Sequence, residues 1–224
     1  MDIFWNSLYK NFFAESRYML YLNGLKSTIL LSLAAIALGI VLGLAVTLLR
    51  RSRFKVLRAI GYVYVDVIRG TPMMVQLVLI YFVVFSSVSI SKFVVAFIAF
   101  GFNSGAYISE IFRAGIESID KGQAEAGRSL GLSKNKTMAF IIIPQAVKNI
   151  LPTLANEFIA LVKETAIVGV IALDDLTRAS DIVISITYSG FAPRIIIAVM
   201  YYIVIKLLTL GLGWFEKKLK KSDH

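Results

Sequence analysis

Residues 27–49 of the 224-residue chain, STILLSLAAIALGIVLGLAVTLL, contain no charged side chain. A helix needs about 20 apolar residues to cross the hydrocarbon core of a bilayer, so this segment is long enough to span one. In water, a helix that is apolar all round would expose a large hydrophobic surface. The segment therefore predicts an integral membrane protein.

The composition supports this interpretation. Hydrophobic residues make up 58% of the chain and charged residues 17%, with a mean hydropathy of +0.75. Soluble domains average about 45–50% apolar and about 25% charged residues. The net charge of +10 comes from basic residues that cluster between the apolar segments. This arrangement is typical of membrane topology signals and not of a nucleic-acid surface, so we expect no nucleic-acid partner.

The residue types also exclude several kinds of chemistry. The chain has no cysteine, which excludes disulfides and thiolate metal sites, and its one histidine is the terminal His224. Acid–base catalysis by histidine and histidine-ligated metal sites are therefore not expected. We predict that the chain is not an enzyme and has no catalytic residue, metal site or bound cofactor.

Five apolar segments predict an all-α integral membrane protein with one domain over residues 1–224. The predicted spans cover approximately residues 25–49, 70–90, 93–114, 149–173 and 194–215. Gly39 and Gly43 in the first span have the spacing that permits close approach of a second helix.

The distribution of lysine and arginine predicts the orientation of these spans. Basic residues gather in the links of residues 50–69 and 113–148, and four lysines follow the last span. The link of residues 174–190 has three aspartates against Arg178 alone. We therefore expect the N-terminus outside and the C-terminus in the cytoplasm.

Residues 50–69 alternate basic and apolar side chains. This pattern predicts an amphipathic helix that lies on the membrane surface before the chain turns inward at Gly70–Pro72. An ordinary cytoplasmic extension of the second span is the alternative. Arg69, at the end of this segment, would bind a lipid phosphate or pair with an acid in the next cytoplasmic link.

That next link, residues 118–144, predicts two helices joined by a tight turn. Asp120 can cap a short helix over residues 121–130, and Gly131 can end it in the left-handed conformation. Ser133 can cap a second helix that runs to Pro144. Such a short cytoplasmic helix suits the transmission of force from a soluble partner; a structured loop without a partner is the alternative.

The same link resembles the EAA loop of ATP-binding-cassette (ABC) importer permeases. The family pattern is Glu-Ala-Ala, three residues, Gly, nine residues, Ile, one residue, Leu-Pro. The chain matches this spacing throughout, with Gly127 in place of the second alanine and Ile143 in place of leucine. The resemblance implies a set of residues that couple the permease to an ATPase: Glu125, Ala126, Gly127, Leu130, Gly131 and Pro144.

Further segments resemble the polar amino-acid subfamily of these permeases: Asn23–Leu25, Arg69–Pro72 with Gln76, Ser104–Ile111 and Asn156–Thr165. The resemblance implies a multi-pass permease of a bacterial or archaeal cell membrane, paired with a second, identical or similar permease. It also implies two cytoplasmic ATPases that bind ATP and Mg, and an external binding protein that delivers an amino acid. The chain itself has no glycine-rich phosphate loop.

Polar residues within the predicted spans mark a candidate substrate route, because a charged side chain near the bilayer centre costs about 2.5–3.5 kcal/mol. At 100° per residue, four of them share one sector of the fourth span: Asn156, Glu157, Lys163 and Glu164. A second stripe follows i, i+4, i+7 on the third span: Asn103, Tyr107 and Glu110.

From these stripes we predict the residues along the substrate pathway: Asn103, Tyr107, Glu157, Lys163 and Glu164. Asn103 and Glu157 would contact the amino acid, and the Glu157 carboxylate would accept its ammonium group. The alternative is that these polar groups satisfy one another across helices.

Two other classes of function remain to be compared. An ion-coupled secondary transporter could use Glu110, Glu157 and Glu164, but many such proteins have more spans and paired repeats. A membrane enzyme would need a nucleophile–base pair or a metal cluster, for which the chain has poor candidates. A pure scaffold would not need charged stripes inside its spans.

Overall fold

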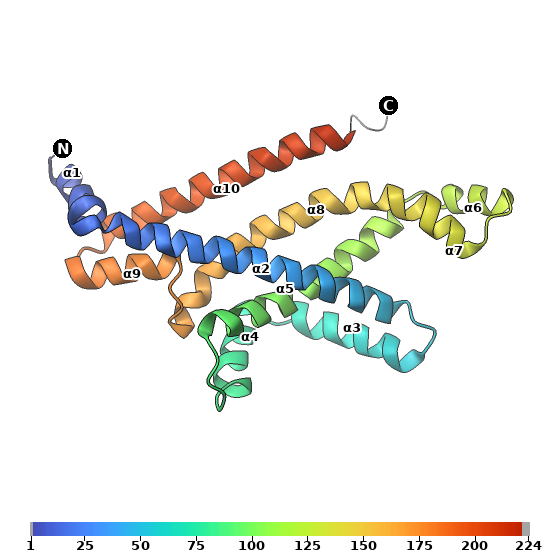
Figure 1. Ribbon diagram of the computed structural model, residues 1–224, viewed down its shortest axis with the longest axis horizontal. Helices are drawn as coiled ribbons and strands as arrows, with labels where there is room; N and C mark the ends of the chain where they lie inside the picture. Colours follow the sequence, from blue (N-terminus) through green and yellow to red (C-terminus); the bar gives the residue numbers. More distant parts are fainter. Residues whose placement is uncertain (1, 221–224) are drawn as a thin grey trace.

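The computed structural model describes residues 2–220, and every regular element in this range is a helix. Four long helices form the body of the molecule: α2 (Tyr18–Arg50), α5 (Lys92–Glu117), α8 (Ile143–Glu164) and α10 (Phe191–Lys220). The molecule is elongated, with α1 (Asp2–Leu8) and α9 (Leu176–Thr187) at one end (Figure 1). We call the opposite end, formed by α6 (Lys121–Ser129) and α7 (Lys134–Thr137), the hairpin end.

The remaining elements are short. Two α-helices follow α2 in the chain: α3 (Lys55–Arg69) and α4 (Met73–Leu79). Wide π-helical turns form η1 (Tyr9–Phe13), η3 (Ile80–Val84) and η4 (Met138–Ile142). Tighter 3₁₀ turns form η2 (Ala14–Ser16) and η5 (Thr165–Ile171).

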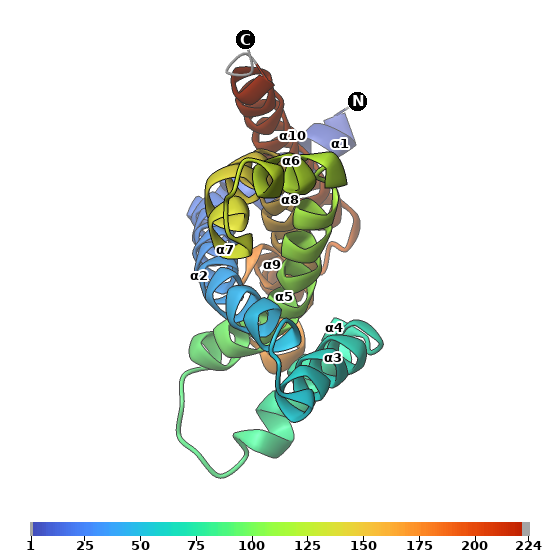
Figure 2. The ribbon, with the colours of Figure 1, turned by 90° about the vertical axis from the view of Figure 1, so that its right-hand side faces the viewer.

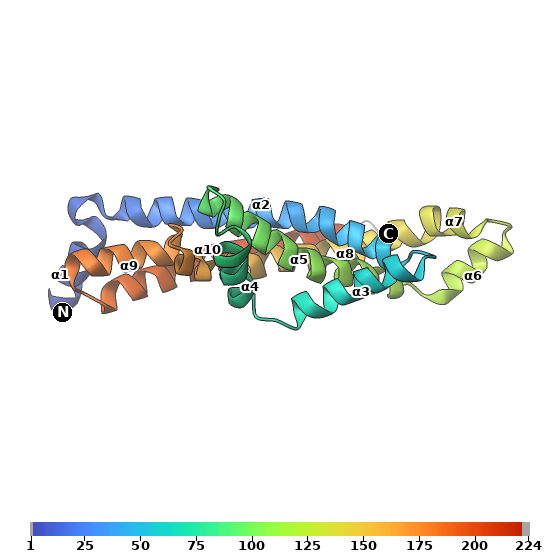
Figure 3. The same cartoon turned by 90° about the horizontal axis from the view of Figure 1, so that it is seen from below.

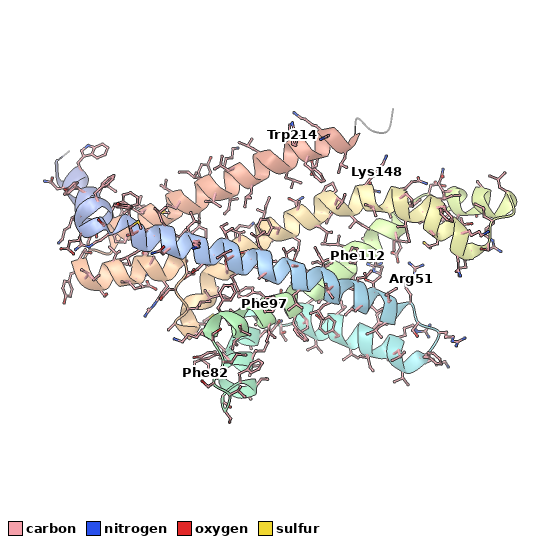
Figure 4. All side chains as sticks on the ribbon, viewed as in Figure 1. Arg51, Phe82, Phe97, Phe112, Lys148 and Trp214 are labelled. Atoms are coloured by element: carbon pink, nitrogen blue, oxygen red, sulfur yellow. The ribbon has the colours of Figure 1, made fainter. Side chains whose placement is uncertain are left out.

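The centre of the molecule is the contact between α2 and α5. A Cβ atom on Gly39 would lie 2.9 Å from the Cβ of Ser104, and one on Gly43 would lie 2.7 Å from Cγ2 of Ile108. The predicted role of these two glycines in close helix approach is therefore confirmed. The apolar core continues along α5 onto α8, and Phe97 and Phe112 of α5 pack against it (Figure 4).

Among the described residues, three helices are long and apolar enough to cross a membrane: α2, α5 and α10. Helix α8 has sufficient length but includes four charged residues, Lys148, Glu157, Lys163 and Glu164. Helix α10 separates from the bundle towards its C-terminal end (Figures 1 and 2). Trp214 on this free end is 67% exposed (Figure 4), so α10 offers most of its apolar surface to its surroundings.

The predicted span over residues 70–90 is shorter in the structure. Its helical part is α4 with η3, Met73–Val84, and residues 85–91 form turns and irregular backbone. At 1.5 Å per residue, this segment covers roughly 18 Å of a hydrocarbon core about 30 Å thick. It joins α3 at a bend of 107°, so α3 and α4–η3 together form a broken span or a re-entrant segment.

The expectation that residues 50–69 lie flat on the membrane surface is wrong. Helix α3 runs back along the second half of α2 (Figure 3): Gly61 lies beside Arg50, and Val65 packs with Val46. A helix antiparallel to a spanning helix cannot also lie in the membrane plane. The alternative, an extension of the second span, is compatible with the structure only with a sharp bend, because α3 and α4–η3 meet at 107°.

The alternation of basic and apolar residues in α3 has a different physical cause. One side of the helix packs against α2 and α5 through Gly61, Val65 and the Tyr64 hydroxyl, which donates a hydrogen bond to the carbonyl of Phe102. The helix also carries an exposed apolar stripe: Val56, Ile60, Val63 and Val67. The exposed stripe adjoins the packed side, so α3 has one broad apolar sector, and Lys55, Arg58 and Arg69 share the sector opposite to it.

Candidate functional site

A cavity of about 560 Å³ lies between α5 and α8, with the last residue of α3 at its rim. Its polar lining comes from three helices: Arg69, Tyr107, Glu110, Ser118, Asn149, Thr153, Asn156 and Glu157. Apolar residues of α5 supply the rest of the wall. A cavity of this size, with a few convergent polar groups, has the dimensions of a small-molecule site.

Glu157 is the acidic group on the α8 side of this cavity. Ser104 of α5 donates a hydrogen bond from its hydroxyl to Oε1 of Glu157 over 3.1 Å. Among the described residues we find no second hydrogen bond to this carboxylate. Glu157 is therefore held in place by α5 and retains accepting capacity for a ligand in the cavity.

Glu110 is the centre of an ion-pair cluster at the opposite wall. Its carboxylate lies 2.5 Å from Nη1 of Arg50 on α2 and 2.7 Å from Nη2 of Arg113 on α5. Arg69 approaches the same carboxylate only to 3.9 Å, beyond hydrogen-bond range. The cluster ties the end of α2 to α5, because only 10% of the Arg50 side chain and 18% of the Glu110 side chain are exposed.

Asn103 has a structural position instead of one on the cavity wall. It is 3% exposed, and its amide Nδ2 donates to Oε1 of Gln76 over 3.1 Å. Gln76 in turn donates to the carbonyls of Ile68 and Thr71. These bonds attach the bend between α3 and α4 to α5. For Asn103, the structure therefore agrees with the alternative to a substrate contact, in which polar groups of different helices bond to one another.

The other predicted pathway residues divide between two places. Tyr107 and Glu157 line the cavity, but Lys163 and Glu164 lie at the end of α8, exposed and outside the lining. The cavity lining also includes Arg69, Asn149 and Thr153, which were not among the predicted pathway residues. Asn149 and Thr153 are one helical turn apart and continue to Asn156 on the same face of α8, a signal that the sequence does contain.

Helices α6 and α7 form a hairpin that joins the end of α5 to the start of α8, and both helices have the predicted N-terminal caps. The Asp120 side chain accepts from the backbone N–H of Gly122 over 2.6 Å, and Ser133 caps α7. Gly131 has φ = +82°, the left-handed conformation in which a side chain is strained. The turn is closed by the N–H of Leu132, which donates to the carbonyl of Gly127.

The predicted end of the second helix at Pro144 is wrong. The helix continues through the π-helical turn η4 directly into α8. In that wide turn the N–H of Ile143 donates to Met138, five residues back. Pro144 follows directly after this wide turn, and its missing N–H does not end the helix. The hairpin is therefore continuous with the helix that carries Glu157.

The surface of the hairpin exposes two large apolar side chains and one carboxylate. Leu130 is 82% exposed at the tip, and Phe140 is 73% exposed. Glu125 is exposed, with no hydrogen bond or ion pair within residues 2–220. Leu130 and Phe140 thus give the hairpin exposed apolar surface near the Glu125 carboxylate, and this surface is available to another protein.

Gly127 is the contact point between the two arms of the hairpin. A Cβ atom there would lie 2.8 Å from both Cδ1 of Ile141 and Cγ2 of Thr137. Gly127, which stands where the family pattern has its second alanine, therefore permits α6 to pack closely on α7 and η4.

We predict that Gly127→Val loosens the hairpin by about 1–3 kcal/mol, since overpacked contacts cost this much. Limited digestion with trypsin, which cleaves after Arg128, should become about 5- to 100-fold faster as the local open state is populated. Gly211→Val on α10, where no atom lies within 4 Å of an added Cβ, is the matched control and should leave the digestion rate unchanged. Equal rates for both variants would contradict the close packing.

A second cavity, of about 600 Å³, lies between the hairpin and the ion-pair cluster. Lys121, Ala124 and Met138 line it from the hairpin, and Arg50 and Arg113 line it from the cluster. This cavity leaves open space between the hairpin and the end of α2.

Comparison with known proteins identifies the class of protein to which this geometry belongs. Residues 35–221 match the family described as binding-protein-dependent transport system inner membrane component. The chain belongs to this family. It is a permease, and so a non-catalytic subunit of a transporter.

Two relatives and one solved structure show how far the similarity extends. The permease is 40% identical over 205 residues to a putative glutamine transport system permease of Rickettsia typhi, covering 91% of this chain and 94% of the relative. It is 40% identical over 204 residues to an arginine transport system permease of Bacillus subtilis, covering 90% and 93%. A crystal structure of an amino acid ABC transporter with histidines matches with a TM-score of 0.88 and 43% identity, covering 92% and 98%.

Proposed function

We propose that this permease forms the translocation pathway for a polar amino acid in an ABC importer and couples the pathway to ATP hydrolysis by a partner ATPase. The supporting observation is that the hairpin and helix α8 form one continuous helical unit. Helix α8 begins in the exposed hairpin and carries Glu157 in the wall of the polar cavity. The relatives' substrates, glutamine and arginine, and the transporter with histidines support a polar amino acid as the cargo.

We further propose five spans with the N-terminus outside and the C-terminus in the cytoplasm. The basic end of α2, the start of α3 and the α6–α7 hairpin lie at the same end of the molecule (Figure 1). The acidic link that precedes α9 lies nearer the other end. The tertiary arrangement thus agrees with the positive-inside rule at each of these places. In this topology α8 is the fourth span, and its charged residues face protein or water.

The partners follow from the family. Two cytoplasmic ATPases would bind ATP and Mg, and each would receive one hairpin through Glu125, Leu130 and their neighbours. A second permease, identical or similar, would complete the pathway, and the exposed apolar stripe of α3 offers surface for it. An external binding protein would deliver the amino acid, and membrane lipid would cover α10.

The mechanism is mechanical. Closure of the ATPases on ATP moves the hairpin; α5 and α8 leave its two ends and transmit the movement to both walls of the cavity. The amino acid, held between these walls, is then exposed alternately to the two sides of the membrane. The open space beneath the hairpin allows the first part of this movement.

Reconstitution in proteoliposomes tests this function against an ion-coupled carrier. We expect uptake of L-glutamine, L-arginine or L-histidine only when the permeases, the ATPases, ATP and the binding protein are all present. Omission of any one should abolish uptake, whereas collapse of the proton or sodium gradient should not. Gradient-driven uptake by the permease alone would contradict the proposal and favour secondary transport.

A further inference from the structure

Arg69 has an unusual position for a basic residue in an apolar protein. It lies at the end of α3, lines the cavity between α5 and α8, and its side chain is 44% exposed. The guanidinium lies over the ring of Tyr107, 5.2 Å from its centroid. A cation–π contact of this kind holds the guanidinium beside the ring and leaves N–H groups available to an anion.

The nearest acid does not satisfy Arg69. Glu110 already accepts hydrogen bonds from Arg50 and Arg113, and Arg69 remains 3.9 Å away from it. Among the described residues we find no hydrogen bond from the Arg69 guanidinium. The donors of this guanidinium thus have no hydrogen-bond acceptor within residues 2–220, and a carboxylate supplies two oxygens in the geometry that a guanidinium prefers.

The same cavity has an acceptor for the opposite charge. Glu157 lines it from α8, with accepting capacity left after its bond from Ser104. An α-amino acid carries a carboxylate and an ammonium group on adjacent carbons. A cavity whose lining offers an unbonded guanidinium at Arg69 and a carboxylate with accepting capacity at Glu157 matches this pair of charges, whatever the side chain of the ligand.

We propose that Arg69 binds the α-carboxylate of the transported amino acid, opposite the ammonium group at Glu157. This inference rests on the proposed function and adds the residue that selects amino acids over amines. Glu110 then has a second role: once the ligand leaves, it is the nearest anion to which Arg69 can turn. The exchange of Arg69 between ligand and Glu110 would connect release of the ligand to the cluster beside the hairpin.

The test compares each amino acid with the amine that lacks its carboxylate. The complete permease–ATPase complex is placed in nanodiscs without the binding protein, and binding is measured for L-arginine against agmatine, L-histidine against histamine and L-glutamine against 4-aminobutanamide. We expect the wild type to bind at least one amino acid about 10- to 100-fold more tightly than its amine, the effect of a charge-assisted hydrogen-bonded pair.

In Arg69→Gln this preference should disappear, because amino-acid binding weakens while amine binding stays the same. Arg69→Lys should restore part of it. Arg58→Gln, which removes an exposed charge from the same helix outside the cavity, is the matched control and should keep the wild-type preference. An unchanged preference in Arg69→Gln, or an equal loss for amino acid and amine, would overturn the proposal.

Two further arms separate this proposal from its alternatives. If the effect of Arg69→Gln vanishes in nanodiscs without anionic lipid, Arg69 binds a lipid phosphate and the proposal is overturned. Glu157→Gln should weaken amino acid and amine alike, so a loss there with no effect at Arg69 would refute only the role of Arg69. Failure of the wild type to bind any of the six ligands would refute the membrane binding site itself.

Discussion

Replacement of Leu130 by aspartate is expected to separate the permease from its ATPases. Leu130 is 82% exposed at the tip of the hairpin, so the change should leave the fold intact. An apolar anchor at the centre of an interface contributes about 2 kcal/mol or more, and a buried unpaired charge adds a further penalty. We expect the affinity for the ATPase to fall at least about 30-fold, and ATP hydrolysis stimulated by the loaded binding protein to fall to its basal rate.

The measurement is co-purification of ATPase with tagged permease, followed by ATP hydrolysis in proteoliposomes. Phe54→Asp is the matched control, because Phe54 is 57% exposed in the link between α2 and α3, outside the hairpin. That variant should keep its ATPases. Normal assembly and normal stimulation of Leu130→Asp would show that the hairpin tip does not bind the ATPase.

Substitution of Glu157 by glutamine is expected to slow transport without loss of assembly. Glutamine has nearly the same volume as glutamate, and its side-chain oxygen can still accept the hydrogen bond from Ser104. The substitution therefore removes only the negative charge that faces the cavity. A hydrogen bond to a charged group contributes about 1.5–3 kcal/mol, which corresponds to about a 10- to 100-fold loss in apparent affinity for the amino acid. ATPase binding and basal ATP hydrolysis should not change.

Uptake at varied substrate concentration in proteoliposomes gives the apparent affinity and the maximal rate. Glu164→Gln is the matched comparison, since Glu164 lies on the same helix, two turns further on and outside the cavity lining. We expect it to transport close to the wild-type rate. If Glu164→Gln were as defective as Glu157→Gln, the effect would come from the charge of the helix and not from contact with the ligand.

Much of the fold could be predicted, because the relevant physics is local. An apolar run long enough to cross a bilayer predicted α2, and Asp120, Gly131 and Ser133 predicted the two helices of the hairpin and the turn between them. Caps and turns depend on a residue and its neighbours within one helical turn. The same local reasoning gave the wrong end at Pro144, since it did not anticipate that a π-helical turn would carry the helix onward.

The candidate site could be predicted only in part. Periodicity placed Tyr107 and Glu157 on the faces of their helices that line the cavity. The spacing i, i+4, i+7 grouped Asn103 with Tyr107 and Glu110, although Asn103 bonds to Gln76 at a bend that no periodicity predicts. Arg69 was assigned to lipid or to an acid in the hairpin link, because the sequence does not show that α3 folds back along α2.

The sequence by itself determined the membrane class, the helical segments, the distribution of basic residues and the form of the hairpin, all of which depend on neighbouring residues. The tertiary structure alone decided that α3 is antiparallel to α2, that Glu110 binds Arg50 across 60 positions, and that Arg69 and Glu157 share one cavity. These contacts depend on the angles at which helices pack and on one 107° bend. Such angles are set by side chains from distant parts of the chain, and so they have no signature in any one segment.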